Sequence, residues 1–512
     1  MRSLVLNGLL MLPLVILGCK SLPDLDHRTV STARLDTHDT QLGQALEPLT
    51  QAHPGLAGIY PLRNARHAFA ARVVLAHAAE RTLDIQYYIW RHDRTGTMLF
   101  DAVRTAADRG IRVRLLLDDN NTSGLDGILA ALDAHPQIEI RLFNPFLYRN
   151  LRVLDFITDF GRVNRRMHNK SFTIDNQVTI IGGRNVGDEY FGATDDMLFA
   201  DLDVLAIGPV VKDVSRDFDR YWSSASSYPA DRLLPPVDAA ILAEIARKAR
   251  ELEQSPEAAA YIEAIRSLPF VQDLKEHRLP FEWAETRMVS DDPRKGLGQA
   301  PPDGLLPHRL MKVLGTPKAH VDLVSPYFVP TEDGVESFAS LTEEGVQIRV
   351  LTNSFEATDV AFVHAGYARR RRALLKHEVK LYEFRGPPRE PEQGSAFNPR
   401  GSSRTSLHAK TFATDGLRVF IGSFNFDPRS AKLNTEMGFV IESPILARQI
   451  KTVFDRDVPL NAYELALNAE GGLIWIERQG ERRVEHTVEP NMNVWERLLV
   501  WLLAQLPIEW LL

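Results

Sequence analysis

Two stretches of the chain repeat one order of apolar and polar positions. Alternating apolar runs begin at Leu83-Asp84-Ile85 and at Val321-Asp322-Leu323, and each is followed by a helical stretch that ends in a glycine, Gly110 or Gly345. Each glycine leads directly into a further apolar run. Such alternation indicates the strands and helices of an α/β domain. The recurrence of the whole order predicts that this domain is duplicated.

Each repeat also contains a predicted hairpin. Strand-like runs span residues 167–174 and 407–414, and they end in the dipeptides Asp175-Asn176 and Asp415-Gly416. Both dipeptides favour a two-residue turn, and a second apolar run follows each of them. Side chains alternate along a strand, so residues two apart in these runs share one face.

One motif occupies both hairpins with the same spacing. The first copy consists of His168, Lys170, Asp175, Gly182 and Asn185. Every interval recurs in the second copy, which consists of His408, Lys410, Asp415, Gly422 and Asn425. A single short motif is a weak indication of function, but two copies with matching intervals are a strong one.

The residue types of the two motifs suit a phosphodiester substrate. In each copy the His and Lys share a strand face, and the glycine lets the backbone bring the asparagine back toward that face. Lysines and asparagines can hold phosphoryl oxygens as negative charge builds on them. One neutral imidazole can attack phosphorus while the other, protonated, donates to the leaving alkoxide. Asp175 and Asp415 stand in the turns, which indicates a structural part for the third motif residue.

These motifs resemble the paired HxKxxxxD motifs of the phospholipase D superfamily. The segments RMHNKSFTIDNQVTIIGGRNVGDEYF and SLHAKTFATDGLRVFIGSFNFDPRSAKLNTEMGFVIESP are similar to those of bacterial cardiolipin synthases, especially the third, C-type branch. The similarity covers most of the chain from about Gly55 to the C-terminus. It implies a duplicated phospholipase D fold of class α/β, in which two α/β/α sandwich repeats share one active site.

The resemblance also implies roles for individual residues. His168 would attack the donor lipid to form a covalent phosphatidyl-histidine. His408 would protonate the departing alcohol and then deprotonate the incoming one. The residues grouped as catalytic are His168, Lys170, Asp175, His408, Lys410 and Asp415.

Four further residues complete the predicted site. Asn185 and Asn425 would bind phosphoryl oxygens together with the lysines. Asp201 and Glu436 each lie eight residues before a proline, and they resemble the acids that hold each catalytic histidine by its other ring nitrogen. The family needs no metal or other cofactor. Asp118-Asp119, at the end of a predicted strand, fit either a metal site or, as the preferred interpretation, a solvated loop with helix-capping acids.

The predicted reaction is phosphatidyl transfer, with cardiolipin synthesis from phosphatidylglycerol and a second phospholipid as the preferred interpretation. The predicted partners are a membrane surface and phospholipids, namely phosphatidylglycerol and, as a second candidate, phosphatidylethanolamine. Hydrolysis to phosphatidic acid by the same residues is the first alternative. A nuclease, another phosphodiesterase or a catalytically inactive scaffold is the second. A net charge of −7 argues against a nucleic-acid partner, and complete motifs argue against an inactive scaffold.

The N-terminus is typical of an exported bacterial lipoprotein. Arg2 precedes an apolar run that ends in a lipobox-like sequence with Cys19, the only cysteine. We predict a lipoprotein signal peptide over residues 1–18 and an envelope protein anchored by lipidated Cys19, with Lys20 favouring the periplasmic face of the outer membrane. An uncleaved membrane anchor is the alternative. The polar residues 19–54 are predicted to form a tether.

The remaining chain divides at composition changes. We predict a first repeat over residues 55–230, a helical inter-repeat insertion over 231–307, a second repeat over 308–460 and a C-terminal extension over 461–512. The extension ends in an apolar tail that Leu and Trp dominate. Pro507 argues against a membrane-spanning helix there, so the tail either packs on the domain or lies in a membrane interface, the preferred interpretation.

Three polar segments accompany the motifs. Gly386–Arg404, rich in Pro, Gly and charge, is predicted to be a mobile loop that acts as a lid immediately before the second motif. Arg165-Arg166 fit either contact with an anionic headgroup or a charged loop. The run Arg369–Arg372 is predicted to be a solvated helix face, with headgroup contact as the alternative.

Overall fold

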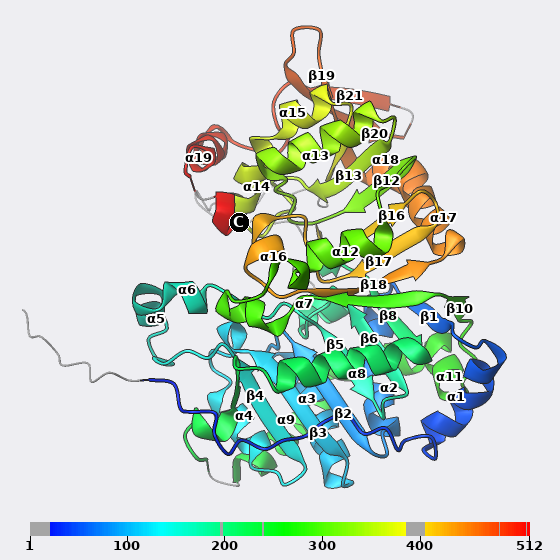
Figure 1. Ribbon diagram of the computed structural model, residues 1–512, viewed down its shortest axis with the longest axis vertical. Coiled ribbons are helices and arrows are strands. Elements are labelled where there is room, and N and C mark those ends of the chain that lie inside the picture. Colours follow the sequence, from blue (N-terminus) through cyan, green and yellow to red (C-terminus); the bar gives the residue numbers. More distant parts are fainter. Residues whose placement is uncertain (1–20, 195–197, 238–239, 386–404, 481, 508) are drawn as a thin grey trace, which may run out of the picture.

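A computed structural model describes residues 21–194, 198–237, 240–385, 405–480, 482–507 and 509–512. Two α/β units lie one above the other, with the first repeat below and the second above in Figure 1. Each unit is built on its own mixed β-sheet, with helices packed against it. The predicted duplicated α/β fold is therefore confirmed.

The first sheet contains nine strands within the described residues. Their bounds are β1 Ala57–Leu62, β2 Thr82–Tyr87, β3 Arg112–Asp118, β4 Ile138–Phe143, β5 Ser171–Ile174, β6 Val178–Gly182, β8 Asp203–Ile207, β9 Ser227–Pro229 and β10 Glu282–Ala284. They lie in the order β10-β1-β8-β6-β5-β2-β3-β4-β9. β2, β3 and β4 are parallel, and the hairpin β5-β6 pairs antiparallel to β2.

The second sheet contains ten described strands. Their bounds are β11 Thr286–Ser290, β12 His320–Val324, β13 Gln347–Asn353, β14 Lys380–Phe384, β16 Thr411–Thr414, β17 Arg418–Gly422, β18 Met437–Glu442, β19 Ala462–Leu467, β20 Leu473–Gln479 and β21 Arg482–His486. They lie in the order β11-β18-β17-β16-β12-β13-β14-β19-β20-β21. The run β18-β17-β16-β12-β13-β14 reproduces β8-β6-β5-β2-β3-β4 of the first sheet, which is the structural form of the repeat.

Helices cover both sheets. Those of the first repeat are α2 Ala65–Ala78, α3 Arg94–Asp108, α4 Asp126–Asp133, α5 Val153–Thr158, α6 Phe160–Val163, α7 Asp188–Phe191 and α8 Pro209–Trp222. Those of the second are α12 Leu306–Leu314, α13 Thr331–Glu343, α14 Ala361–Ala368, α15 Arg371–Lys376, α16 Pro428–Lys432, α17 Pro444–Thr452 and α18 Val458–Asn461. The glycines predicted to end α3 and α13, Gly110 and Gly345, have left-handed φ of 88° and 89°, which side chains disfavour.

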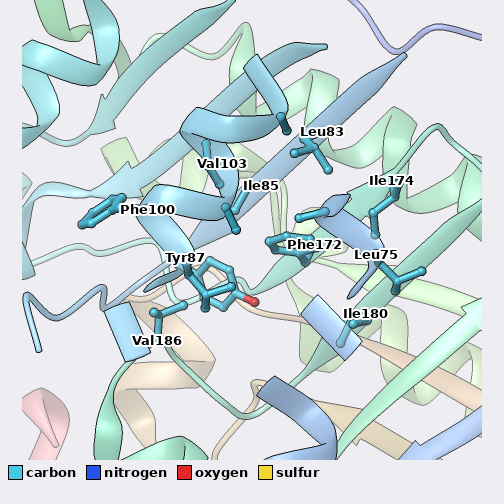
Figure 2. Close-up of a cluster of buried hydrophobic side chains, with 14 of the residues drawn as sticks. Leu75, Leu83, Ile85, Tyr87, Phe100, Val103, Phe172, Ile174, Ile180 and Val186 are labelled. Carbon is cyan, nitrogen blue, oxygen red and sulfur yellow. The ribbon is translucent and has the colours of Figure 1, made fainter. Parts of the chain in front are cut away.

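Apolar packing fixes each sheet and joins the two repeats. Figure 2 shows Ile85 and Tyr87 of β2 together with Phe100 and Val103 of α3 in the buried core of the first repeat. A second buried cluster draws on both sheets, with members such as Val204 from β8 and Phe439 from β18. Burial of these surfaces is the main favourable term that holds the repeats together.

The segment between the repeats, predicted to be a helical insertion, contains helices in its described residues. It forms three helices, α9 Ala240–Glu253, α10 Pro256–Arg266 and α11 Pro269–Lys275, which pack on α2, α3 and α4 of the first repeat. Tyr261 and Phe270 are buried in the main core of that repeat. The chain then enters β10, on the edge of the first sheet, and β11, on the edge of the second. The segment therefore covers one repeat and bridges to the other.

The structure also differs from the predicted tether between residues 21 and 54. Arg28 donates hydrogen bonds to the carbonyls of Ser224 and Ser227, at 2.7 and 3.1 Å. Helix α1, Gln41–Ala52, buries Leu42 and Leu46 in the first-repeat core. These leucines lie four residues apart and so share one helix face, a short periodic signal inside a polar segment. Described residues of this segment therefore pack on the first repeat.

The C-terminal extension adds β19, β20 and β21 to the second sheet and ends in α19, Val494–Ala504, and the short helix η6, Glu509–Leu511. Helix α19 packs against α14 and buries Val500. Its other side leaves Trp495 and Trp501 exposed, at 75% and 57% of their surface. None of the helices in the described part of the chain is both long and apolar enough to cross a membrane.

Candidate active site

The two motifs meet because each one pairs with the backbone of the other repeat. The N–H of His168 donates to the carbonyl of Thr435 at 2.9 Å, and the N–H of His408 donates to the carbonyl of Ala200 at 2.8 Å. A short parallel pair of strands, β7 Leu198–Ala200 and β15 Thr405–Leu407, reinforces the second contact. Each histidine is thus fixed one residue from an acid of the opposite repeat.

Those acids hold the histidine rings across the repeat boundary. His168 Nδ1 lies 2.8 Å from Glu436 Oε2, and His408 Nδ1 lies 2.5 Å from Asp201 Oδ2. All four side chains are buried or nearly so. Because Nδ1 of each ring is paired with a carboxylate, Nε2 is the nitrogen left to meet a substrate. The sequence indicated that these acids hold the histidines, but not that each acid serves the other repeat.

Aromatic rings enclose the two histidines. The Tyr88 ring stands edge-on to His168, with centroids 5.0 Å apart. Tyr190 and Phe199 lie 5.3 and 4.8 Å from the His408 ring. Tyr88 directly follows β2. Tyr190 and Phe199 carry no motif signal that would have identified them.

The two lysines lie deep beside their histidines. Both have about 1% of their surface exposed. Lys170 Nζ donates to the His168 carbonyl, and Lys410 Nζ donates to the His408 carbonyl at 2.5 Å. Burial lowers the pKa of both ammonium groups, more strongly for Lys170. Such poorly solvated cations are suited to pairing with an anionic phosphoryl group.

The two asparagines differ in their partners. Asn185 accepts a hydrogen bond from the Ile89 N–H at 3.2 Å and donates one to the Tyr190 hydroxyl at 3.0 Å. The Asn425 Oδ1 atom is buried, and among the described residues it has no hydrogen-bond partner. A buried amide oxygen without a partner is costly unless a ligand or water satisfies it. Asn425 is therefore the better placed of the two to meet a bound group.

Burial keeps both imidazoles neutral. It lowers the pKa of His168 well below its ordinary value, and the positive charges of Lys170 and Lys410 lower it further. Burial, followed by the charge of Lys410, lowers the pKa of His408 to about 4. A neutral imidazole is the form that can act as a nucleophile or a base.

The two acids respond to burial in opposite directions. Burial raises the pKa of Glu436 to about 7, although Lys170 opposes this rise. Burial would also raise the pKa of Asp201, but attraction to His408 and the hydrogen bond between them lower it overall. The carboxylate beside His408 is therefore the more firmly ionised of the two.

Asp175 and Asp415, grouped with the catalytic residues, lie away from the paired histidines, at the hairpin turns. Both aspartates have positive φ, as a two-residue turn requires. The Asp175 carboxylate accepts hydrogen bonds from the backbone N–H groups of residues 80–82, and the Asp415 carboxylate accepts them from those of residues 318–320. The structure therefore gives Asp175 and Asp415 a structural role at the turns, which corrects their grouping with the catalytic residues and agrees with their predicted turn position.

The strands of the two hairpins are shorter than predicted. Strands β5 and β16 begin only after the motif lysines, so the motif histidines and lysines precede these strands.

The acids considered for a metal site have protein partners instead. Asp118 accepts a hydrogen bond from the Met167 N–H at 2.7 Å and pairs with Arg166. Asp119 pairs with Arg149 at 2.6 Å. No group of three or more His, Cys, Asp or Glu side chains within the described residues is arranged to hold a metal ion. Arg166 is buried in this network, so it is not a headgroup ligand on the surface.

The arginine run divides between surface and core, which corrects the prediction of a solvated face. Arg371 is buried and pairs with Glu489 at 2.8 Å, and Arg370 pairs with Glu509 at 2.8 Å. Arg369 and Arg372 are exposed. Cys19 and the predicted lid Gly386–Arg404 lie outside the described residues.

Both repeats match one family model. Its description is "Cardiolipin synthase, PLD-like domain", and the matched residues are 74–222 and 310–458. The chain belongs to this family. The two matched segments contain both histidine motifs together with Asp201 and Glu436.

Individual relatives agree with this membership. The chain is 51% identical over 475 residues to Cardiolipin synthase C of Escherichia coli (strain K12). The aligned region covers 92% of this chain and 100% of that protein. The chain is 22% identical over 401 residues to Cardiolipin synthase of Clostridium perfringens (strain SM101 / Type A), covering 77% of this chain and 69% of that protein. The resemblance to cardiolipin synthases seen in the sequence is confirmed.

A solved structure shares the fold. It is phosphatidylserine synthase of Haemophilus influenzae Rd KW20, with a TM-score of 0.53 and 13% identity over 81% of this chain and 90% of that chain. At this identity the likeness concerns the fold alone.

Proposed function

We propose that this PLD-like enzyme transfers a phosphatidyl group through a covalent phosphatidyl-histidine and makes cardiolipin from phosphatidylglycerol and a second phospholipid. The observation that carries the proposal is the crossed pairing of two neutral, buried histidines with acids of the opposite repeat. Membership in the cardiolipin synthase family supports the choice of substrate class.

In the first step, Nε2 of His168 attacks the phosphorus of the donor lipid. The bond from phosphorus to the departing glycerol oxygen breaks, and that oxygen takes a proton from His408 Nε2. The bound phosphodiester anion supports protonation of His408, because a nearby negative charge raises an imidazole pKa. Asp201, the more firmly ionised acid, stabilises the resulting imidazolium. Lys170 and Lys410 offset the charge on the phosphoryl oxygens.

In the second step, the phosphatidyl group leaves His168. His408, now neutral, removes a proton from the hydroxyl of the incoming alcohol, whose oxygen then attacks phosphorus. The bond from phosphorus to His168 Nε2 breaks. If the alcohol is the glycerol end of phosphatidylglycerol, the product is cardiolipin. Asn425, with its unpartnered oxygen, is proposed to contact the substrate in both steps.

The location proposed for this reaction is a bacterial membrane surface. Phosphatidylglycerol and phosphatidylethanolamine, the proposed substrates, reside there. The lipobox-like sequence around Cys19 supports anchoring of an exported chain, and Lys20 supports the outer membrane. If Cys19 is acylated, a fatty-acid probe should label the wild-type chain and not the Cys19→Ser variant. An unlabelled wild-type chain of full precursor length would instead indicate an uncleaved anchor.

The decisive experiment measures products from purified full-length enzyme and phosphatidylglycerol vesicles by lipid mass spectrometry. We expect mainly cardiolipin and free glycerol, with phosphatidic acid as the minor product. Exclusion of water from the covalent intermediate is needed for this outcome. Phosphatidic acid as the main product, whatever acceptor lipid is supplied, would establish hydrolysis as the activity.

A further inference from the structure

The exposed apolar side chains include two clusters, one carried by the first repeat and one mainly by the C-terminal extension. The first, here called the α5–α6 cluster, consists of Leu151, Val153, Phe156, Ile157 and Phe160. The second, here called the tail cluster, consists of Phe362, Val494, Trp495, Leu498, Trp501, Leu502, Leu506 and Trp510. Large apolar side chains exposed in groups, in contrast to scattered single ones, indicate an interaction surface.

Helix α16, which follows the second motif, links the segments that carry the two clusters. Arg429 of α16 donates to the carbonyl and side-chain oxygens of Asn164, at 3.0 and 2.6 Å. Asn164 follows α6 and lies four residues before His168. Arg429 Nε also donates to the carbonyl of Leu511 at 3.0 Å, at the end of the tail. Figure 1 shows α5, α6 and α19 on the same side of the molecule, on the left.

Contacts with the second repeat hold the tail cluster, and its apolar side chains stay exposed. Val500 anchors α19 against α14, and the Arg370–Glu509 ion pair fixes η6. Trp501 stays 57% exposed in this arrangement, so its face has no partner within the described chain. An exposed apolar face of this kind is suited to an external partner.

The composition of the clusters favours lipid as that partner. The tail holds three of the seven tryptophans of the chain, and Trp with Leu is the combination that settles at a bilayer interface. Exposed Arg369, which donates to the Ala504 carbonyl at 3.5 Å, places a positive charge beside the cluster, where an anionic lipid surface would attract it.

We propose that the α5–α6 cluster and the tail cluster together form the bilayer-docking surface of this enzyme. Docking through both clusters holds both halves of the shared site at the leaflet. A donor and an acceptor lipid then reach the histidines without either one crossing water. The identity of those lipids rests on the proposed function, whereas the docking itself does not.

The test places an environment-sensitive dye on the full-length chain carrying Cys19→Ser, so that acylation of Cys19 cannot anchor it. Dyes at Ile157→Cys and at Trp501→Cys report the two clusters. A dye at Ile445→Cys is the matched control, since Ile445 is 46% exposed on α17, which lies on the opposite side in Figure 1. With phosphatidylglycerol and phosphatidylethanolamine vesicles, we expect a blue shift at the first two positions and none at the third. A missing shift at either cluster, or an equal shift at Ile445→Cys, overturns the proposal.

The same experiment distinguishes lipid docking from a contact between two copies of this protein. A blue shift that develops without vesicles and grows with protein concentration means that a second copy covers the clusters, which overturns lipid docking. The dye result stands whether or not the enzyme turns over phosphatidylglycerol, so failure of the proposed function is distinguished from failure of docking.

Turnover assays on vesicles and on dispersed lipid provide a second test of the docking surface. The double variant Ile157→Glu with Trp501→Glu should lose about tenfold in turnover of vesicle phosphatidylglycerol, because docking scales with the apolar area that enters the interface. Turnover of dispersed short-chain phosphatidylglycerol by this double variant should stay at the wild-type level. The control variant Ile445→Glu should keep wild-type turnover on both vesicle and dispersed lipid. Equal loss on vesicles and on dispersed lipid would overturn the docking role.

A separate observation concerns the segment between the repeats. Lys295 is buried with 1% of its surface exposed, and its Nζ donates to Asp291 Oδ2 at 2.9 Å and to the Ser430 carbonyl at 2.8 Å. Asp291 Oδ2 also accepts the N–H of Glu436 at 2.8 Å, and the Asp291 N–H donates to the Glu436 carbonyl at 3.0 Å. The backbone of Glu436 is thus clamped from both sides.

We infer that the buried Asp291–Lys295 pair is a positioning device that holds Glu436 against His168. The pair comes from the inter-repeat segment and not from either motif, so the segment takes part in the site through Glu436. A charge-free replacement of Lys295 leaves Asp291 without its counter-ion and loosens the clamp on Glu436. Titratable groups of both repeats and of the segment surround Glu436, namely His168, Lys170, Lys410, Asp291, Lys295 and Asp427.

The test compares pH profiles of kcat for Lys295→Met, Lys295→Arg and wild type. Lys295 lowers the pKa of Glu436, so its removal should move the acidic limb of the profile to higher pH, whereas Lys295→Arg should keep the limb near the wild-type position. We expect kcat of Lys295→Met to fall about tenfold near neutral pH with little change in KM, since Lys295 is buried and its ammonium group is bonded to Asp291 and Ser430. A Lys295→Met enzyme with an unshifted profile would reduce the pair to a purely structural role and overturn the inference.

Discussion

Glu436 holds His168 with a buried carboxylate whose pKa is raised to about 7, whereas Asp201 holds His408 with a carboxylate whose pKa is lowered. The backbone plan of the two halves is the same, because each histidine donates its N–H to the residue before the opposite acid. The same backbone plan therefore holds two acids with opposite pKa shifts, which suits the different roles proposed for the two histidines.

The immediate neighbours of the two acids also differ. Ser423, which follows the motif glycine of the second repeat, donates to Glu436 Oε2 at 2.5 Å. The matching position in the first repeat is Gly183, where any added Cβ would lie 2.1 Å from the Asp201 carboxylate. The shorter acid therefore needs glycine beside it, and the longer acid gains a hydroxyl partner. The Ser423 hydroxyl lowers the pKa of Glu436, so the raised pKa of this acid is due to burial.

The largest expected effect is loss of either histidine. His168→Ala and His408→Ala should each reduce cardiolipin formation by about 10⁴-fold or more, and the double variant should be no worse than either single one, because the pair acts as a unit. A phosphodiester with a good leaving group, such as nitrophenol, sharpens the comparison. It needs no proton from His408, so it should restore turnover to His408→Ala and not to His168→Ala. If only His168→Ala were rescued, His408 would be the nucleophile and His168 the general acid.

Neutral replacement of the acids should separate activity from stability. Glu436→Gln and Asp201→Asn should each lower kcat by about a hundredfold or more, since the ring orientation and charge support are lost. Their effects on melting at pH 8 should have opposite signs.

The signs follow from the two pKa shifts. The pKa of Glu436 is raised from 4.5, so its contribution favours folding at low pH and is lost as pH rises through about 7. Glu436→Gln should therefore raise Tm at pH 8. The pKa of Asp201 is lowered, so its ionised form stabilises the fold at neutral pH, and Asp201→Asn should lower Tm. Calorimetry at pH 5 and pH 8 checks both, and shifts of the same sign at pH 8 would contradict the difference between the acids.

A smaller effect is expected at the hairpin turns. Asp175→Asn should lower the free energy of unfolding by about 2 kcal/mol, because one of its backbone N–H partners is left with a poor acceptor. Asp415→Asn should lower it by less, about 1 kcal/mol, since that carboxylate is more exposed and its partners can reach water. Urea unfolding measures both values. Turnover per folded molecule should stay at the wild-type level, and a large drop in kcat would restore a chemical role to these aspartates.

The smallest expected effect is that of chelators. Treatment with EDTA should leave turnover unchanged, because Lys170 and Lys410 supply the positive charge at the phosphoryl group and Asp118 and Asp119 are engaged by arginines and backbone. Product assays with and without EDTA suffice. Activity that disappears with EDTA and returns with a divalent ion would require a metal role for these two acids.

Local sequence signals predicted much of this molecule. The turn dipeptides at Asp175 and Asp415, the glycines that end α3 and α13, and the duplicated motif are short-range features whose physics is contained in a few residues. They sufficed to predict the repeat and to name both histidines.

What the sequence left open depends on contacts between distant segments. Glu436 lies 268 residues from His168, so no short sequence interval predicts that each acid pairs with the histidine of the other repeat. The same holds for the hydrogen bonds between Asp291 and the backbone of Glu436. The segment before β1 was predicted to be a tether because polar residues dominate it, while two leucines on one face of α1 were enough to pack it. Arg371 was predicted to face solvent because arginines usually do, but Glu489, far along the chain, provides a buried partner.

The crossed pairing of acids and histidines also constrains how this chain can change over time. A duplicated domain ordinarily leaves one copy free to drift while the other keeps the original task. Here a drift of Asp201 in the first copy disables the histidine of the second, and a drift of Glu436 disables that of the first. Neither copy can be a spare, so the two must be inherited, varied and selected as one.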